Sequence, residues 1–219
     1  MAETVAQLSE IEDMLQQLPA AKRTVVLKCL TDLFVEDSRR YQPEHIALFD
    51  TLFSQLTTEI DTGALAAFSR RLAPLTTAPA KTIGRLALND DISVAEPVLV
   101  SSPRAEDAIL MDIARTKGQM HLLAIACRPK LAAAIVDLLI ERGDDVVVRY
   151  VANNQGARLS EAGLLALINR AKTDDALADI VKQRDDIPRH LLKTTTAKTA
   201  KTPAQTEAKA AKRGSNAAA

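Results

Sequence analysis

The sequence contains no tryptophan, and aromatic residues make up only 3% of its 219 positions. It also has only seven glycines, too few for the turns that a many-stranded sheet requires. Alanine and leucine carry much of the apolar content, which is 47% of the chain, and both residues favour helices. The composition therefore disfavours sheet-rich folds and predicts an all-α protein that is long enough to bury a core.

The sequence also lacks a long hydrophobic segment. No run approaches about 18 uncharged apolar residues, so no membrane span is predicted. The first residues, MAETVAQLSEIEDML, are acidic and polar, unlike a secretory signal. We therefore expect a cytoplasmic protein.

Cysteine is scarce as well. Cys29 and Cys127 lie far apart, each within an apolar helical pattern. Such cysteines usually behave as small buried apolar residues, so we expect buried, reduced thiols. A disulfide or a reactive thiol is the alternative.

Net charge is zero, but it is unevenly distributed. Residues 193–219 contain six basic residues and one acid, which leaves the rest of the chain acidic. This segment is rich in Lys, Ala and Thr and has no apolar periodicity, so we predict a disordered basic tail. It would serve either for solubility alone or for weak contact with nucleic acid or another polyanion.

Apolar residues recur at helical spacing throughout the first part of the chain. We expect Pro43 near the start of one helix and Asp61 as the cap of another. Residues 1–73 are predicted to form an N-terminal helical segment, a cap that packs on the rest of the fold. The expected helices lie within residues 3–18, 21–40, 43–60 and 62–75.

The chain then begins to resemble itself. Four successive segments each contain the end of one helix, a polar or proline-containing break, a longer amphipathic helix and a polar stop, and a truncated fifth follows. The four segments end at Asp91, Gly118, Asp145 and Asp175, roughly 27 to 30 residues apart. This period predicts HEAT-like helix-pair repeats over residues 74–192, stacked as an α-solenoid. A plain helical bundle with coincidental similarity is the alternative.

Helix-end chemistry supports these boundaries. We expect Gly118 and Gly143 to end helices with positive φ, and Ser160 to cap the helix that follows it. Aspartate pairs recur at the unit boundaries, at positions 90–91, 144–145 and 174–175. Such pairs can serve acid–base chemistry, but their repetition favours helix capping.

No pattern in the sequence indicates catalysis. His45, His121 and His190 are isolated from other metal-ligating residues, and no glycine-rich phosphate loop or nucleophile motif occurs. For His121, a capping or inter-repeat hydrogen bond is favoured over catalysis. We therefore expect no enzyme activity, no cofactor and no metal.

Polar residues near the unit boundaries are the candidate partner-binding groups. Several arginines recur there, so stacked units would align them on one face. The alternative is a ladder of ion pairs with neighbouring acids, and asparagines at a helix end could instead satisfy its free carbonyls. The candidates are Arg128, Arg142, Arg149, Asn153, Asn154 and Arg158.

Three stretches carry a family resemblance. They are Leu30 to Leu56, RLALNDDISVAEPVLVSSP, and the run from His121 to Ala171. Together they resemble the bacterial proteins grouped as domain of unknown function 2336, over roughly residues 20–192. The resemblance implies an all-helical, armadillo- or HEAT-like protein of the bacterial cytoplasm, and it implies no activity.

These observations favour an interaction protein that binds a protein or peptide partner on a curved helical-repeat surface. Two other functions remain open. One is nucleic-acid binding through an arginine stripe and the basic tail, and the other is sensing of a small anionic ligand such as a signalling nucleotide. The sequence also leaves homo-oligomer formation open.

Overall fold

The computed structural model describes residues 18–188, and within that range the chain forms eleven α-helices and no strand. The all-α prediction is therefore confirmed. The helix predicted within residues 3–18 and the tail at 193–219 lie outside the described residues. The helices are α2 (Ala20–Asp37), α3 (Pro43–Leu56), α4 (Thr62–Leu72), α5 (Ala80–Ala87), α6 (Ile92–Ser101), α7 (Asp107–Thr116), α8 (Gln119–Ala126), α9 (Ala133–Arg142), α10 (Asp145–Asn153), α11 (Glu161–Ala171) and α12 (Asp175–Lys182).

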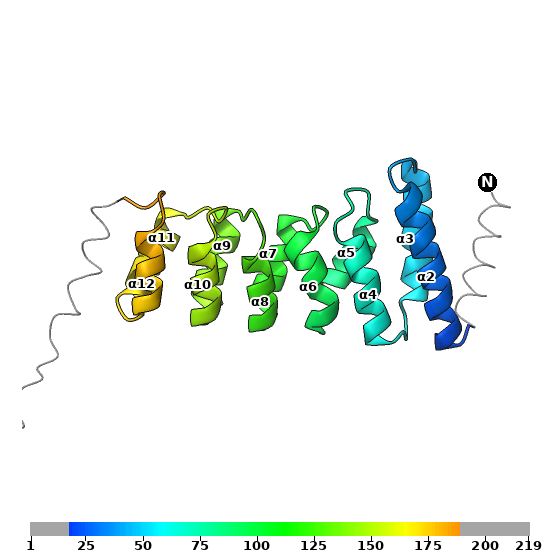
Figure 1. Cartoon of the computed structure of the whole chain (residues 1–219), viewed down its shortest axis with the longest axis horizontal. Coiled ribbons are helices and arrows are strands. Elements are labelled where there is room, and N and C mark those ends of the chain that lie inside the picture. Colours follow the sequence, from blue (N-terminus) through cyan, green and yellow to red (C-terminus); the bar gives the residue numbers. More distant parts are fainter. Residues whose placement is uncertain (1–17, 189–219) are drawn as a thin grey trace, which may run out of the picture.

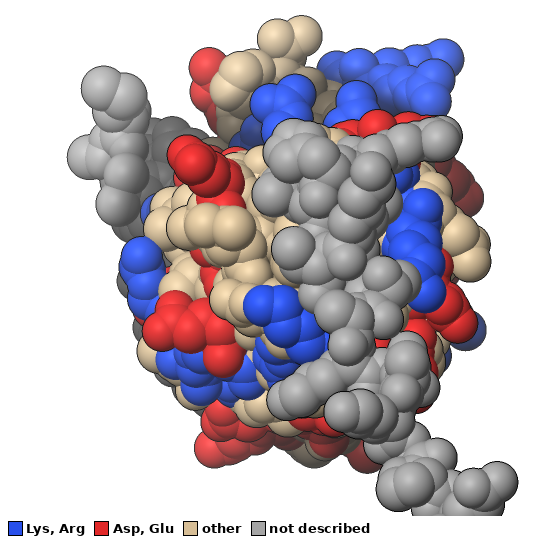
Figure 2. Space-filling view, turned by 90° about the vertical axis from the view of Figure 1, so that its left-hand side faces the viewer, with Lys and Arg blue, Asp and Glu red and all other residues tan. Residues whose placement is uncertain are grey.

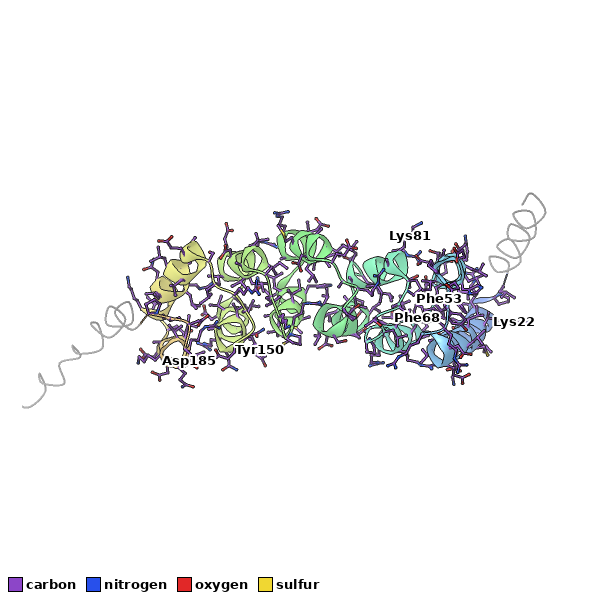
Figure 3. All side chains as sticks on the ribbon, turned by 90° about the horizontal axis from the view of Figure 1, so that it is seen from above. Lys22, Phe53, Phe68, Lys81, Tyr150 and Asp185 are labelled. Carbon is purple, nitrogen blue, oxygen red and sulfur yellow. The ribbon has the colours of Figure 1, made fainter. Side chains whose placement is uncertain are left out.

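The helices form two layers in an elongated array (Figures 1 and 3). The even-numbered helices pack side by side in one layer, in the order α2, α4, α6, α8, α10, α12. The odd-numbered helices from α3 to α11 do the same in the other layer. Consecutive helices cross between the layers, so each pair adds one step to the array. A single pair could not bury its own apolar face, whereas stacked pairs share one continuous core.

Aromatic residues gather at the N-terminal end of this core. Phe34, Phe49 and Phe53 pack against one another, and the Phe53 and Phe68 rings lie 4.9 Å apart in an edge-to-face arrangement. Figure 3 shows Phe53 and Phe68 between the layers. From α5 onwards the core is aliphatic, with fully buried residues such as Ile113. This agrees with the low aromatic content, because closely packed helices need few large rings.

The predicted helix caps are confirmed. The side chains of Asp61, Asp91, Asp144, Ser160 and Asp174 each accept a backbone N–H in the first turn of the following helix. One member of every aspartate pair therefore satisfies an otherwise free helix donor. Pro43 occupies the first position of α3, as its missing N–H and fixed φ favour.

Gly118 and Gly143 do lie at helix ends as predicted, just after α7 and α9, but the positive φ predicted for both is wrong. No glycine has a positive φ in residues 18–188: Gly118 precedes α8 with φ −83°, and Gly143 follows α9 with φ −69°. Gly143 is instead required for space, because a Cβ there would lie 2.4 Å from the Leu139 carbonyl oxygen. Sequence shows where a helix stops, but it does not distinguish a need for backbone freedom from a need for close approach.

Both cysteines are free, but they are exposed rather than buried. On α2 the buried face consists of Arg23, Leu27, Thr31 and Phe34, and this leaves Val25 62% exposed. Cys29, which we expected to be buried, lies with Val25 on a second apolar stripe of this helix. The buried face of α2 could not be recognised from apolar residues alone, because it includes two polar side chains. Arg23 donates to the Leu18 and Thr58 carbonyls, and Thr31 donates to the Leu27 carbonyl.

No helix in the described part of the chain is long and apolar enough to cross a membrane.

Candidate partner-binding surface

Arg128, the first of the predicted site residues, caps a neighbouring helix. It follows α8, and its guanidinium donates to the Leu99 carbonyl at 2.7 Å and to the Ser102 carbonyl at 2.9 Å. These carbonyls lie at the C-terminal end of α6, where helix acceptors have no partner of their own. Burial lowers the pKa of Arg128, and the charge of Asp107 partly offsets this. Arg128 is half-buried and engaged within the fold.

Asn154 performs the same task one unit later. Its Nδ2 donates to the carbonyls of Ala126 and Arg128, at 2.9 and 2.7 Å, and so closes the end of α8. Its Oδ1 accepts the Gly156 N–H at 2.9 Å. All the strong hydrogen-bonding groups of this amide are therefore used inside the molecule. This matches the alternative in which asparagine satisfies the carbonyls of a helix end.

Arg184 repeats the arrangement after α12, and the sequence prediction missed it. Its side chain is buried and donates to the carbonyls of Ala152, in the last turn of α10, and of Asn154 and Ala157, just beyond it, at 2.8 to 3.0 Å. A signal was present, since Arg128, Asn154 and Arg184 each follow an even-numbered helix by one or two residues. We call these three residues the carbonyl ladder.

The odd-numbered layer is capped in a similar way. Arg142 donates to the Ala114 carbonyl near the end of α7. Arg170 donates to the carbonyls of Ile140 and Gly143, each at 2.8 Å, and pairs with Asp145 at 3.1 Å. The alternative of a ladder of arginine and acid pairs therefore describes only some of these arginines. Arg128 and Arg142 bond to backbone carbonyls, because helix C-termini carry partial negative charge.

Arg149 forms an ion pair between α10 and α12. Its Nε lies 2.8 Å from a carboxylate oxygen of Asp174, the residue that caps α12. The hydrogen bond raises the pKa of Arg149 and lowers that of Asp174. One carboxylate therefore caps α12 and joins it to α10.

The two remaining candidates, Asn153 and Arg158, are exposed. Arg158 lines a concave pocket of about 400 Å³ between the loops that follow α8 and α10. Lys130 lines the same pocket and, like Arg158, its side chain makes no hydrogen bond or ion pair within residues 18–188. Arg158 thus differs from the other predicted arginines, Arg128, Arg142 and Arg149, whose side chains are bonded within the fold.

A short backbone bridge shapes this pocket. Leu131 donates to the Gly156 carbonyl, and Arg158 donates back to the Leu131 carbonyl, each at 3.1 Å. Gly156 must be glycine here, because a Cβ would lie 1.8 Å from the Pro129 carbonyl oxygen. The bridge therefore holds Lys130 and Arg158 on a fixed frame.

Apolar side chains are exposed on the outer side of the even-numbered layer. Met120 on α8 is 59% exposed, and Val146 and Tyr150 on α10 are 48% and 51% exposed. Tyr150 points away from the opposite layer in Figure 3. We call Met120, Val146 and Tyr150 the apolar face. The residue types show that these side chains are apolar, but the sequence alone does not show that the opposite side of each helix meets the core.

Charges of both signs are mixed at the end of the array formed by α11 and α12. The part of this end that is left uncovered in Figure 2 shows basic and acidic side chains side by side. Ion pairs such as Lys182–Asp179, at 2.9 Å, account for part of the mixture.

His121 forms the predicted inter-repeat hydrogen bond. Its Nε2 lies 2.9 Å from the Asn89 carbonyl oxygen, which follows α5. In residues 18–188 no group of three or more His, Cys, Asp or Glu side chains is placed to hold a metal ion.

Residues 94–218 match the family model described as "Uncharacterised protein conserved in bacteria (DUF2336)". The chain belongs to this family. The match covers more than half of the sequence and includes most of the basic tail, which the predicted resemblance left out. It begins at Val94, so it does not extend to the N-terminal stretch from Leu30 to Leu56. No curated protein and no solved structure matches the chain.

Proposed function

We propose that this protein is a non-enzymatic interaction module whose helix pairs are HEAT-like repeats stacked as an α-solenoid. The two-layer packing supports this classification, as do the starts of α6, α8, α10 and α12, which recur 26 to 30 residues apart. Arrays in which each unit touches only its neighbours offer extended surfaces to partners. A cytoplasmic location is part of the same proposal.

The apolar face carries the proposal that the module binds a protein partner. Single exposed apolar residues are common on soluble proteins, but here three large ones lie on two helices that pack side by side. Leu123, half-buried on α8, extends the same side. Aromatic residues and methionine are enriched at interfaces relative to the rest of a protein surface.

Charges beside the apolar face suggest the chemistry of the partner. Glu96 on α6 is exposed and near enough to Cys127 to raise the pKa of that thiol. On the other side, Asp179 on α12 is exposed and shares only a surface ion pair with Lys182. We therefore propose an amphipathic helical segment whose apolar residues are flanked by Lys or Arg.

Affinity capture with the full-length chain, followed by titration of the purified partner, tests this function. Tyr150→Glu and Met120→Glu should each weaken binding at least tenfold, because a charge at the centre of an interface must be desolvated. Leu165→Glu is the matched control: Leu165 is 50% exposed on α11, in the other layer, so its replacement should leave binding unchanged. Equal binding by all three variants would refute the proposed face.

A further inference from the structure

We propose that the pocket between the loops after α8 and α10 binds the phosphate group of a small ligand, at a site separate from the apolar face. Lys130, Gln155 and Arg158 supply the donors. These side chains provide an ammonium, an amide and a guanidinium, which can all donate to phosphate oxygens. The pocket volume, about 400 Å³, is within the range of small-molecule sites and leaves room for more than one phosphate group.

The pairing of the basic residues supports this assignment. Arg128, Arg142 and Arg149, from the same part of the chain, are all occupied by carbonyls or by Asp174. Lys130 and Arg158 differ from them, since neither side chain has a partner in the described residues. Two cations beside one concavity attract an anion, and within residues 18–188 no group neutralises them through a hydrogen bond.

The frame of the pocket is fixed before any ligand arrives. Lys130 precedes Leu131 and Arg158 follows Ala157, so the two cations flank the backbone bridge between the loops. Asn154 ties the same loops together through the carbonyls of Ala126 and Arg128. A rigid frame lowers the entropic cost of binding, because the loops need not be ordered by the ligand.

Asp107 also lines the pocket and opposes an anion. It leaves one net positive charge among the three ionised side chains, so affinity for a single phosphate should be modest. Replacing Asp107 also tests whether the ligand of the pocket is an anion or a cation. Asp107→Asn should tighten the binding of an anion, whereas it would weaken that of a cation.

The experiment is an amide-resolved NMR titration of the full chain with inorganic phosphate and with pyrophosphate at low salt. Saturable shifts at the amides of Lys130, Gly156 and Arg158 are expected. Arg158→Ala and Lys130→Ala should each weaken binding about tenfold, the loss expected for one charge-assisted hydrogen bond. Both side chains are exposed, so neither variant should lower the melting temperature.

Arg115→Ala is the matched control. Arg115 is exposed on α7, is absent from the pocket lining and makes no side-chain hydrogen bond or ion pair in the described residues. It removes the same charge and should leave binding unchanged. The proposal is overturned if neither probe gives saturable shifts at the pocket amides. It is also overturned if Arg115→Ala costs as much affinity as Arg158→Ala.

Discussion

Arg184 and Asp186 form a two-bond ion pair just beyond α12, with Nε and Nη2 of the arginine 2.8 and 2.7 Å from the two carboxylate oxygens. The pair fixes the orientation of the planar guanidinium, whose remaining N–H groups reach the carbonyls at and just beyond the C-terminal end of α10. Asp186 thus orients a side chain that joins α12 to α10.

Arg184→Ala should lower the free energy of unfolding by about 1–3 kcal/mol, because buried carbonyls lose their donor. Arg184→Lys should fall between that variant and the wild type, since an ammonium keeps the charge but cannot form the planar fork. Urea unfolding followed by circular dichroism measures both. If the lysine variant equals the wild type, the fork geometry adds nothing to stability.

Asn154→Ala should also destabilise the chain, by about 1–3 kcal/mol, because two carbonyls at the C-terminal end of α8 lose their hydrogen bonds. Asn154→Asp should cost more, since a carboxylate would face two carbonyl oxygens. The neighbour Asn153 provides a matched control, because it is exposed and makes no side-chain hydrogen bond in the described residues. Asn153→Ala and Asn153→Asp should change the melting temperature little, and a comparable loss there would contradict the role of Asn154.

The ion pair of Asp174 predicts a dependence of stability on pH. The hydrogen bond from Arg149 lowers the pKa of Asp174 most, while burial opposes the shift. A carboxyl group whose pKa is lower in the folded state adds stability above its unfolded pKa and loses it as the pH falls through the folded value. Asp174→Asn should therefore cost most near neutrality, and the cost should shrink below about pH 4.

Urea unfolding at pH 7 and pH 3 measures this difference. Because solvent screens an ion pair at the surface, the effect is small and needs a double-mutant cycle. In an Arg149→Gln background, Asp174→Asn should cost less than in the wild type. A cost that is unaffected by the Arg149 replacement would show that Asp174 acts only as a helix cap.

The exposed thiols give a kinetic prediction. Partial desolvation of the exposed Cys127 thiol and the charge of Glu96 raise its pKa. Because the thiolate is the reacting species, Cys127 should react slowly with Ellman's reagent at pH 8. Cys127→Ser should remove the slow phase, and Glu96→Gln should accelerate it. Two titratable thiols are expected without denaturant, so a titre of zero would contradict the exposure of both.

The sequence was sufficient to predict elements whose cause is local. Asp61, Ser160 and one aspartate of each pair cap helices as expected, because a cap needs only its own first turn. The spacing of the repeated segments also predicted that short helices follow one another along this part of the chain. These features depend on contacts between residues that are close along the chain.

Features that depend on neighbouring units could not be predicted in this way. The exposure of Cys29 follows from which side of α2 meets α3 and α4, and two apolar stripes on that helix were compatible with burial. Arg128 and Arg158 occupy similar positions in the sequence pattern. Arg128 nevertheless donates to carbonyls at the end of α6, 26 to 30 residues earlier in the chain, whereas Arg158 lines a pocket. Only the stacking of units separates them.

The direction of the carbonyl ladder has a consequence for synthesis. Arg128, Asn154 and Arg184 each close a helix that comes earlier in the chain, and Arg142 and Arg170 do so in the other layer. As the chain leaves the ribosome, the carbonyls at the end of each of these helices therefore lack their donor until the next helix pair has been made. The most recently made helix pair always has unsatisfied helix ends, and completion advances along the chain one pair behind the growing end.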